Sequence, residues 1–265
     1  GWSTLGRTSG PLNDNYNRNK VKTENYFLKV QVEGEDPQYD DSLENAFSLA
    51  DVSTSNPKKT IITTKLPSER GFGCNKYSSK RSIVIGNQEG GKSDIEFRPG
   101  NWGFHDDSDP KNVRGYLFTV YNSKFAICSD EDFVISNNMS YPAIGFNDYD
   151  NGLVETIGAC DISIEGIYAG NCSNNNNSKP IFNFSDDSNV SFIGCNFQSL
   201  ETKEAPIFKG NDIYFDNVVV EGCDAVYQNF DDNIRNEKIF DINKLTISSK
   251  FSYINNNQIV EKKEN

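Results

Sequence analysis

The sequence is poor in the residues that most enzymes and metal sites depend on. It holds one histidine, His105, so a Ser-His-Asp or Cys-His nucleophile would depend on that residue alone, and no G-x-S-x-G sequence accompanies it. Its six cysteines form no C-x-x-C pair, which argues against zinc and dithiol redox sites. No run of about 18 apolar residues occurs, so the sequence predicts no membrane insertion.

Positive charge is also scarce, with 26 Lys and Arg against 38 Asp and Glu and a net charge of −12. Binding to double-stranded nucleic acid releases counterions through Lys and Arg, so nucleic acid is not expected as a partner. Neutral or amino-sugar-containing glycans, cationic surfaces and complementary proteins remain compatible with this charge.

Helix-forming patterns are rare, whereas turn residues are abundant. Hydrophobic residues make up only 35% of the chain, and asparagine is frequent, with its densest run at 174–177. Asparagine is unfavourable inside helices and favourable in turns, where its side chain bonds nearby backbone. The composition therefore favours an all-β protein with many turns.

The pattern along the chain divides it into three parts. Residues 1–34 are polar, broken by Gly and Pro, and read as an extended arm or linker. Residues 35–255 hold the periodic segments, beginning with an amphipathic helix at 40–50 whose apolar residues follow helical spacing. A β-branched segment at 59–67 follows it, and residues 256–265 form a polar tail.

Pairs of short strands recur from residue 140 onwards. The pairs include 179–184 with 189–194, 205–210 with 212–217, and 237–242 with 244–249. A repeat of about 20 to 35 residues with matching strands and variable loops is typical of a solenoid, in which stacked units share one core. Two inward-facing columns are expected, one of Ile162, Val190, Ile213 and Leu245 and one of Ile164, Phe192, Phe215 and Ile247. A β-sandwich would also supply many short strands but would not explain the repeated pairs.

The strand-and-turn pattern of "SNVSFIGCNF" (188–197) and the helix "DDSLENAFSLA" followed by "TIITTKLP" resemble the pectin-lyase-like right-handed β-helix superfamily, and within it bacteriophage tailspikes. The resemblance covers roughly residues 35–255. It implies an all-β, right-handed parallel β-helix with a short N-terminal capping helix. It also implies an extracellular protein of the virion, in the phage tail or on the capsid surface, that acts as a homotrimer and binds a host cell-surface glycan. Its N-terminal arm would bind other virion or tail proteins.

The candidate catalytic residues are Glu165 and Asp216. If the strands stack as above, these carboxylates face outwards in one column two strands apart, or about 9.6 Å. Glycosidases use two carboxylates about 5 to 9.5 Å apart. Asp161 and Asp212 form a second such pair. Chance stacking is easy in so acidic a chain, so plain surface carboxylates are the competing interpretation.

The candidate glycan-binding residues lie in the variable loops that should stack on one side. They are Asn175, Asn176, Tyr227 and Phe230, because aromatic faces and amide donors suit sugar rings. No cofactor and no metal site is expected. The acidic residues after His105 read as a solvated loop rather than as a calcium site.

Three functions are compatible with these patterns. The first is a spike or receptor-binding protein that presents a glycan-binding face. The second is a polysaccharide depolymerase that uses Glu165 and Asp216, and the third is a purely structural tail or capsid component.

Overall fold

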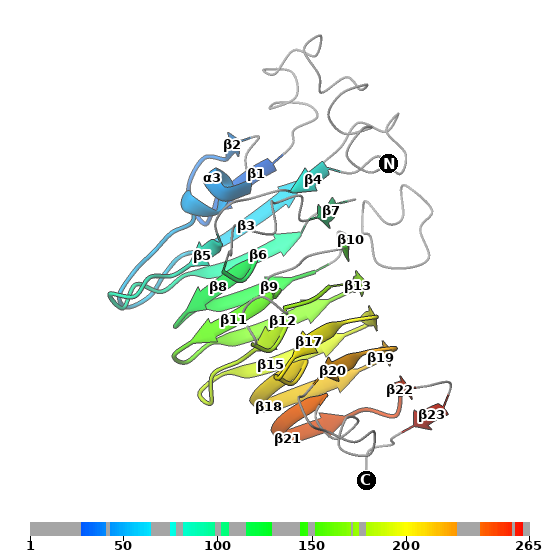
Figure 1. Cartoon of the computed structure of the whole chain (residues 1–265). Coiled ribbons are helices and arrows are strands. Elements are labelled where there is room, and N and C mark those ends of the chain that lie inside the picture. Colours follow the sequence, from blue (N-terminus) through cyan, green and yellow to red (C-terminus); the bar gives the residue numbers. More distant parts are fainter. Residues whose placement is uncertain are drawn as a thin grey trace.

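The computed structural model shows a parallel β-solenoid, with one short helix among the residues that it describes, as the sequence predicts (Figure 1). It describes residues 28–40, 43–64, 75–77, 82–98, 102–105, 115–128, 144–147, 152–170, 172–174, 179–226, 239–255 and 258–261. The chain winds through three stacked sets of parallel strands, which we call face 1, face 2 and face 3.

Each face is a ladder of strands taken from successive windings of the chain. Face 1 contains β5 (Ile83–Ile85), β8 (Phe118–Tyr121), β11 (Val154–Ile157), β14 (Phe182–Asn183) and the first parts of β18 (Phe208–Asp216) and β21 (Phe240–Ile247). Face 2 contains β3 (Lys59–Thr64), β6 (Asp94–Arg98), β9 (Lys124–Ile127), β12 (Asp161–Glu165), β15 (Asn189–Ile193) and the remainder of β18 and β21. Face 3 contains β4 (Asn75–Tyr77), β7 (Trp102–His105), β10 (Ile144–Asn147), β13 (Ile167–Gly170), β16 (Asn196–Gln198), β19 (Val218–Glu221) and β22 (Phe251–Asn255). Two further short strands, β17 (Glu201–Lys203) and β20 (Asp224–Val226), pair beside them.

The core consists of inward-facing side chains, most of them at alternate positions along the strands whose side chains the structure describes. The two predicted columns are confirmed, because Ile162 pairs with Val190 and then Ile213, and Ile164 pairs with Phe192 and then Phe215. Rings also stack along face 1, where Phe208 lies 5.1 Å from Phe182 and 5.4 Å from Phe240 between ring centroids. Such pairs add about 0.5–1.5 kcal/mol each beyond their area burial. Every winding therefore depends on its neighbours for a buried surface.

One residue turns the chain from face 2 to face 3. Gly166, Gly194 and Asn217 occupy this position in successive windings with φ of 69°, 63° and 54°. Glycine adopts this left-handed conformation without a Cβ clash, and asparagine tolerates it. The amide of Gly166 donates to the carbonyl of Ile193, and that of Gly194 donates to the carbonyl of Asp216, each at 2.9 Å. The corner thus continues the hydrogen-bonded ladder.

The N-terminal end of the core is covered by a hairpin and the helix. Strand β1 (Leu28–Val32) pairs antiparallel with β3 and with β2 (Gln38–Asp40). Helix α3 (Leu43–Ser48) buries Leu43, Ala46 and Phe47. The Phe47 ring lies 5.2 Å from that of Phe97 and 6.1 Å from that of Phe125. These elements close an edge that would otherwise offer unpaired backbone and apolar surface.

The element boundaries differ from the expected ones in four places. The helix covers Leu43–Ser48 rather than 40–50, with residues 41–42 outside the described part. Strand β1 lies within the segment expected to be an extended arm, and β23 (Gln258–Glu261) lies within the expected polar tail, where it pairs antiparallel with β22. The strands predicted at 205–210 and 212–217 form a single strand, β18, because the backbone passes the corner without leaving the extended conformation.

Candidate functional site

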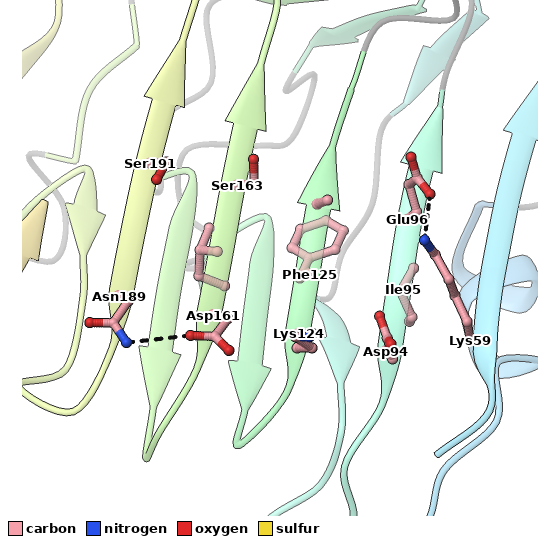
Figure 2. A pocket seen from close by; sticks show the side chains of 12 residues that line it. Lys59, Asp94, Ile95, Glu96, Lys124, Phe125, Asp161, Ser163, Asn189 and Ser191 are labelled. Atoms are coloured by element: carbon pink, nitrogen blue, oxygen red, sulfur yellow. Dashed lines mark hydrogen bonds and ion pairs between the residues drawn. The ribbon is translucent and has the colours of Figure 1, made fainter. Parts of the chain in front are cut away.

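A shallow groove lies on the outer side of face 2, across β3, β6, β9, β12 and β15 (Figure 2). Its volume is about 370 Å³. The floor is formed by small outward side chains in one register column, Ala126, Ser163 and Ser191. The same column continues to Glu96 on one side and to Tyr214 on the other. The strand alternation that builds the core also leaves this row of small residues facing out.

One wall of the groove is a column of charged and polar side chains at the first residue of each strand. In register order these residues are Lys59, Asp94, Lys124, Asp161 and Asn189. Neighbouring positions are one strand spacing apart, about 4.8 Å. The signs alternate over the first four positions, so like charges recur every second strand. The Asn189 amide donates to the Asp161 carboxylate at 3.4 Å (Figure 2).

The column continues beyond the groove with Asp212 and then Lys244. These two residues share the strand position of the groove residues but do not line the groove. They therefore provide matched positions outside the site.

Glu96 is the centre of a charge cluster at one end of the floor. Lys59 Nζ lies 3.2 Å from Glu96 Oε2 (Figure 2), and Arg98 Nε donates to Glu96 Oε1 at 3.0 Å. The Cys128 thiol donates to the same oxygen at 3.2 Å. Burial opposes ionisation of Glu96, but the hydrogen bonds from Arg98, Cys128 and Lys59 outweigh it and lower the pKa to about 2. Glu96 therefore stays ionised at neutral pH and is unsuited to act as a general acid.

Cys128 is not an activated nucleophile. Burial raises the pKa of its thiol to about 12, and the hydrogen bond to the Glu96 carboxylate acts in the same direction. The other described cysteines are Cys160, Cys172, Cys195 and Cys223, which are buried. Within the described residues the cysteines thus serve as small core side chains.

The predicted carboxylate pair is aligned but lies outside the groove. Glu165 pairs with Ile193, which pairs with Asp216, so the two acids occupy one column as expected. Their backbone separation of two strand spacings, about 9.6 Å, is at the upper limit for an inverting glycosidase. The Ile193 side chain projects between them, and neither acid lines the groove. Asp161 and Asp212 are likewise separated by Asn189, and only Asp161 lines the groove.

The four predicted glycan-binding residues, Asn175, Asn176, Tyr227 and Phe230, lie outside the described residues. The groove residues Lys59, Asp94 and Lys124 were not singled out from the sequence. They share one signal, because each immediately precedes the first inward apolar or β-branched residue of a face 2 strand. These three residues form a column only in the structure, where strand pairing aligns successive windings.

A second polar cluster lies beside face 1. The Asn174 side chain donates to the carbonyls of Lys179 at 3.0 Å and Pro180 at 3.2 Å, and the Tyr116 hydroxyl also donates to the Pro180 carbonyl. Glu155 is half-buried nearby, and burial raises its pKa, while the charge of Lys179 opposes that rise. These bonds hold the segment that leads into β14, so the cluster is structural.

The part of the chain that the structure describes offers neither a metal-binding group nor a membrane-spanning helix. No three His, Cys, Asp or Glu side chains gather there in a way that could hold a metal ion. No helix among those residues is long and apolar enough to cross a membrane.

No protein-family model, no curated protein and no solved structure matches the chain.

Proposed function

We propose that the protein binds a surface glycan of a host cell in the groove on face 2. The observation that carries this proposal is the groove itself, which combines a floor of small side chains with a wall of Lys, Asp and Asn. A flat row of Ala and Ser leaves room for a sugar ring, and the wall offers donors and acceptors for hydroxyl groups. Tyr214, the next residue of the floor column, adds an aromatic ring at one end.

The rigidity of the scaffold supports the same function. All groove residues lie on strands that are paired on both sides, β3 with β1 and β6 and the others with neighbours in face 2. Their positions are therefore set by the ladder rather than by loops. A preorganised row of this kind lowers the ordering cost of binding an extended chain. The resemblance to phage tailspikes suggests a receptor-binding virion protein, acting as a homotrimer and joined to other virion proteins through its N-terminal segment.

The depolymerase is the second candidate, because Glu165 and Asp216 occupy one column. Two observations argue against this candidate. Ile193 lies between the two acids, and both acids lie outside the groove. A purely structural component is the third candidate and predicts no glycan binding.

Incubation of the purified chain with a panel of bacterial surface polysaccharides separates these functions. We expect a complex on size-exclusion chromatography with light scattering, without shortening of the polysaccharide. Ser163→Trp fills the floor and should weaken binding at least about tenfold. Thr246→Trp, in the same column but beyond the groove, should leave binding unchanged.

Each other outcome overturns part of the proposal. Shortening of a polysaccharide that is lost in Glu165→Gln and Asp216→Asn would establish the depolymerase instead. Equal binding by Ser163→Trp and the wild type would place the glycan on another face, and no binding to any polysaccharide would favour the structural component.

A further inference from the structure

The groove wall presents opposite charges in strict alternation. Lys59, Asp94, Lys124 and Asp161 follow one another at the first position of four adjacent strands. Of these, Lys59 is paired with Glu96, and Asp161 accepts a hydrogen bond from Asn189. Lys124 and Asp94 form no ion pair with any residue in the described part of the chain. The middle of the wall therefore keeps one ammonium and one carboxylate available to a ligand.

This charge pattern disfavours polymers of a single charge. A polyanion would meet Lys124 but also the carboxylates of Asp94 and Asp161, on a chain with net charge −12. A polycation would meet Lys124 between the two carboxylates. Like charges brought together in a shallow groove repel each other. This repulsion gives the groove specificity, because it weakens the binding of ligands with the wrong charge pattern.

The spacing of the wall favours a glycan over a peptide. Same-side residues of an extended peptide recur every two residues, or about 6.6–6.8 Å. The wall changes sign every strand spacing, about 4.8 Å, and repeats its sign at about 9.6 Å. One sugar of an extended glycan advances about as far as one strand spacing, so neighbouring sugars can face neighbouring wall residues.

We propose that the groove selects a zwitterionic glycan, in which sugars carrying a free ammonium alternate with sugars carrying a carboxylate. The ammonium groups lie opposite Asp94 and Asp161, and a carboxylate lies opposite Lys124. The proposal rests on the proposed glycan-binding function and adds the chemical class of the ligand. Charge-assisted hydrogen bonds between these groups supply the selectivity.

Three oligosaccharides of equal length test the charge pattern directly by calorimetry. At mildly acidic pH, chitosan octasaccharide carries ammonium on nearly every sugar, and hyaluronan octasaccharide carries carboxylate on every second sugar. N-deacetylated hyaluronan octasaccharide carries both in alternation. We expect the last to bind the wild-type chain about three- to tenfold more tightly than either of the others, and added salt should reduce that preference.

Two pairs of variants test whether the preference for the zwitterionic octasaccharide arises in the groove. Lys124→Gln should remove most of the preference, whereas Lys244→Gln, at the same strand position beyond the groove, should keep it. Asp94→Asn and Asp212→Asn form the corresponding pair for the carboxylates. Thermal unfolding of all four variants establishes that each is folded.

The outcomes separate this inference from the proposed function. Equal binding of all three octasaccharides, or tightest binding of a neutral chitin octasaccharide, would overturn the charge selection while leaving glycan binding intact. Binding of an alternating Lys-Glu peptide in preference to the sugars would overturn the ligand class. If no saccharide binds here or in the polysaccharide panel, both proposals fail.

Discussion

At the scale of single residues, the ionisation of Glu96 links the groove to stability. Its side chain is 18% exposed and accepts from Arg98 and Cys128 while pairing with Lys59. The folded-state pKa, about 2, lies below the ordinary value of 4.5. The folded state therefore favours the ionised form, and this contribution is present above pH 4.5 and lost as the pH falls towards 2.

The substitution Glu96→Gln tests this linkage. At pH 7 we expect the free energy of unfolding to fall by about 1–2 kcal/mol, a value reduced for the solvent exposure of Lys59 and Arg98. The difference from the wild type should shrink between about pH 5 and pH 2, as urea unfolding at several pH values would show. Glu165→Gln, which changes an exposed glutamate at the end of β12, is the control and should have a small effect. A difference that is constant with pH would contradict the assigned linkage.

At the scale of elements, the corners tolerate side chains to different degrees although their backbones are alike. Gly86 and Gly194 both have positive φ, 71° and 63°. A Cβ on Gly86 would lie 2.3 Å from the Tyr121 carbonyl oxygen, whereas a Cβ on Gly194 would meet no atom within 4 Å. The first corner is closed by packed backbone and the second is open.

Alanine at these two positions should separate conformational cost from steric cost. Gly194→Ala should lower the free energy of unfolding by about 1 kcal/mol, because the left-handed conformation disfavours a Cβ. Gly86→Ala carries the same cost and adds the clash, so it should be destabilising by at least about 1 kcal/mol more. Urea unfolding of both variants provides the comparison, and equal values would mean that the Gly86 corner shifts freely.

At the scale of the whole molecule, stability should vary along the solenoid because each winding contacts only its neighbours. Strand β15 lies between β12 and β18, whereas β21 pairs only with β18 among the described residues. Phe240, Ile242 and Leu245 are only partly buried, so the β21 winding buries less apolar surface than the windings before it.

Hydrogen exchange followed by mass spectrometry measures this gradient. Peptides that contain β21 should exchange faster than peptides that contain β15, because the terminal winding opens without disrupting the central ladder. Ring burial supports the same order, since Phe208 contacts rings on both adjoining windings and Phe240 is only partly buried. Slower exchange in β21 than in β15 would contradict it.

The sequence by itself determined many of the strands, the corner residues and the inward columns. Alternation in "DISIE" and "NVSFI" specifies which side chains are buried, since a one-residue slip would reverse the faces. Glycine and asparagine mark the turns because few other residues adopt positive φ. The residues of the third strand in each winding were not assigned, because strands such as Asn196–Gln198 are too short to show a period.

The tertiary structure alone decided the groove. Lys124, Asp161 and Asn189 lie 37 and 28 positions apart, and loops of unequal length separate them. Only hydrogen bonding between windings sets which strand residues are neighbours, and this register turns scattered charges into an alternating wall. The same register places Glu165 and Asp216 in one column and Ile193 between them. No local pattern in the sequence encodes such long-range pairing, so only the tertiary structure could show it.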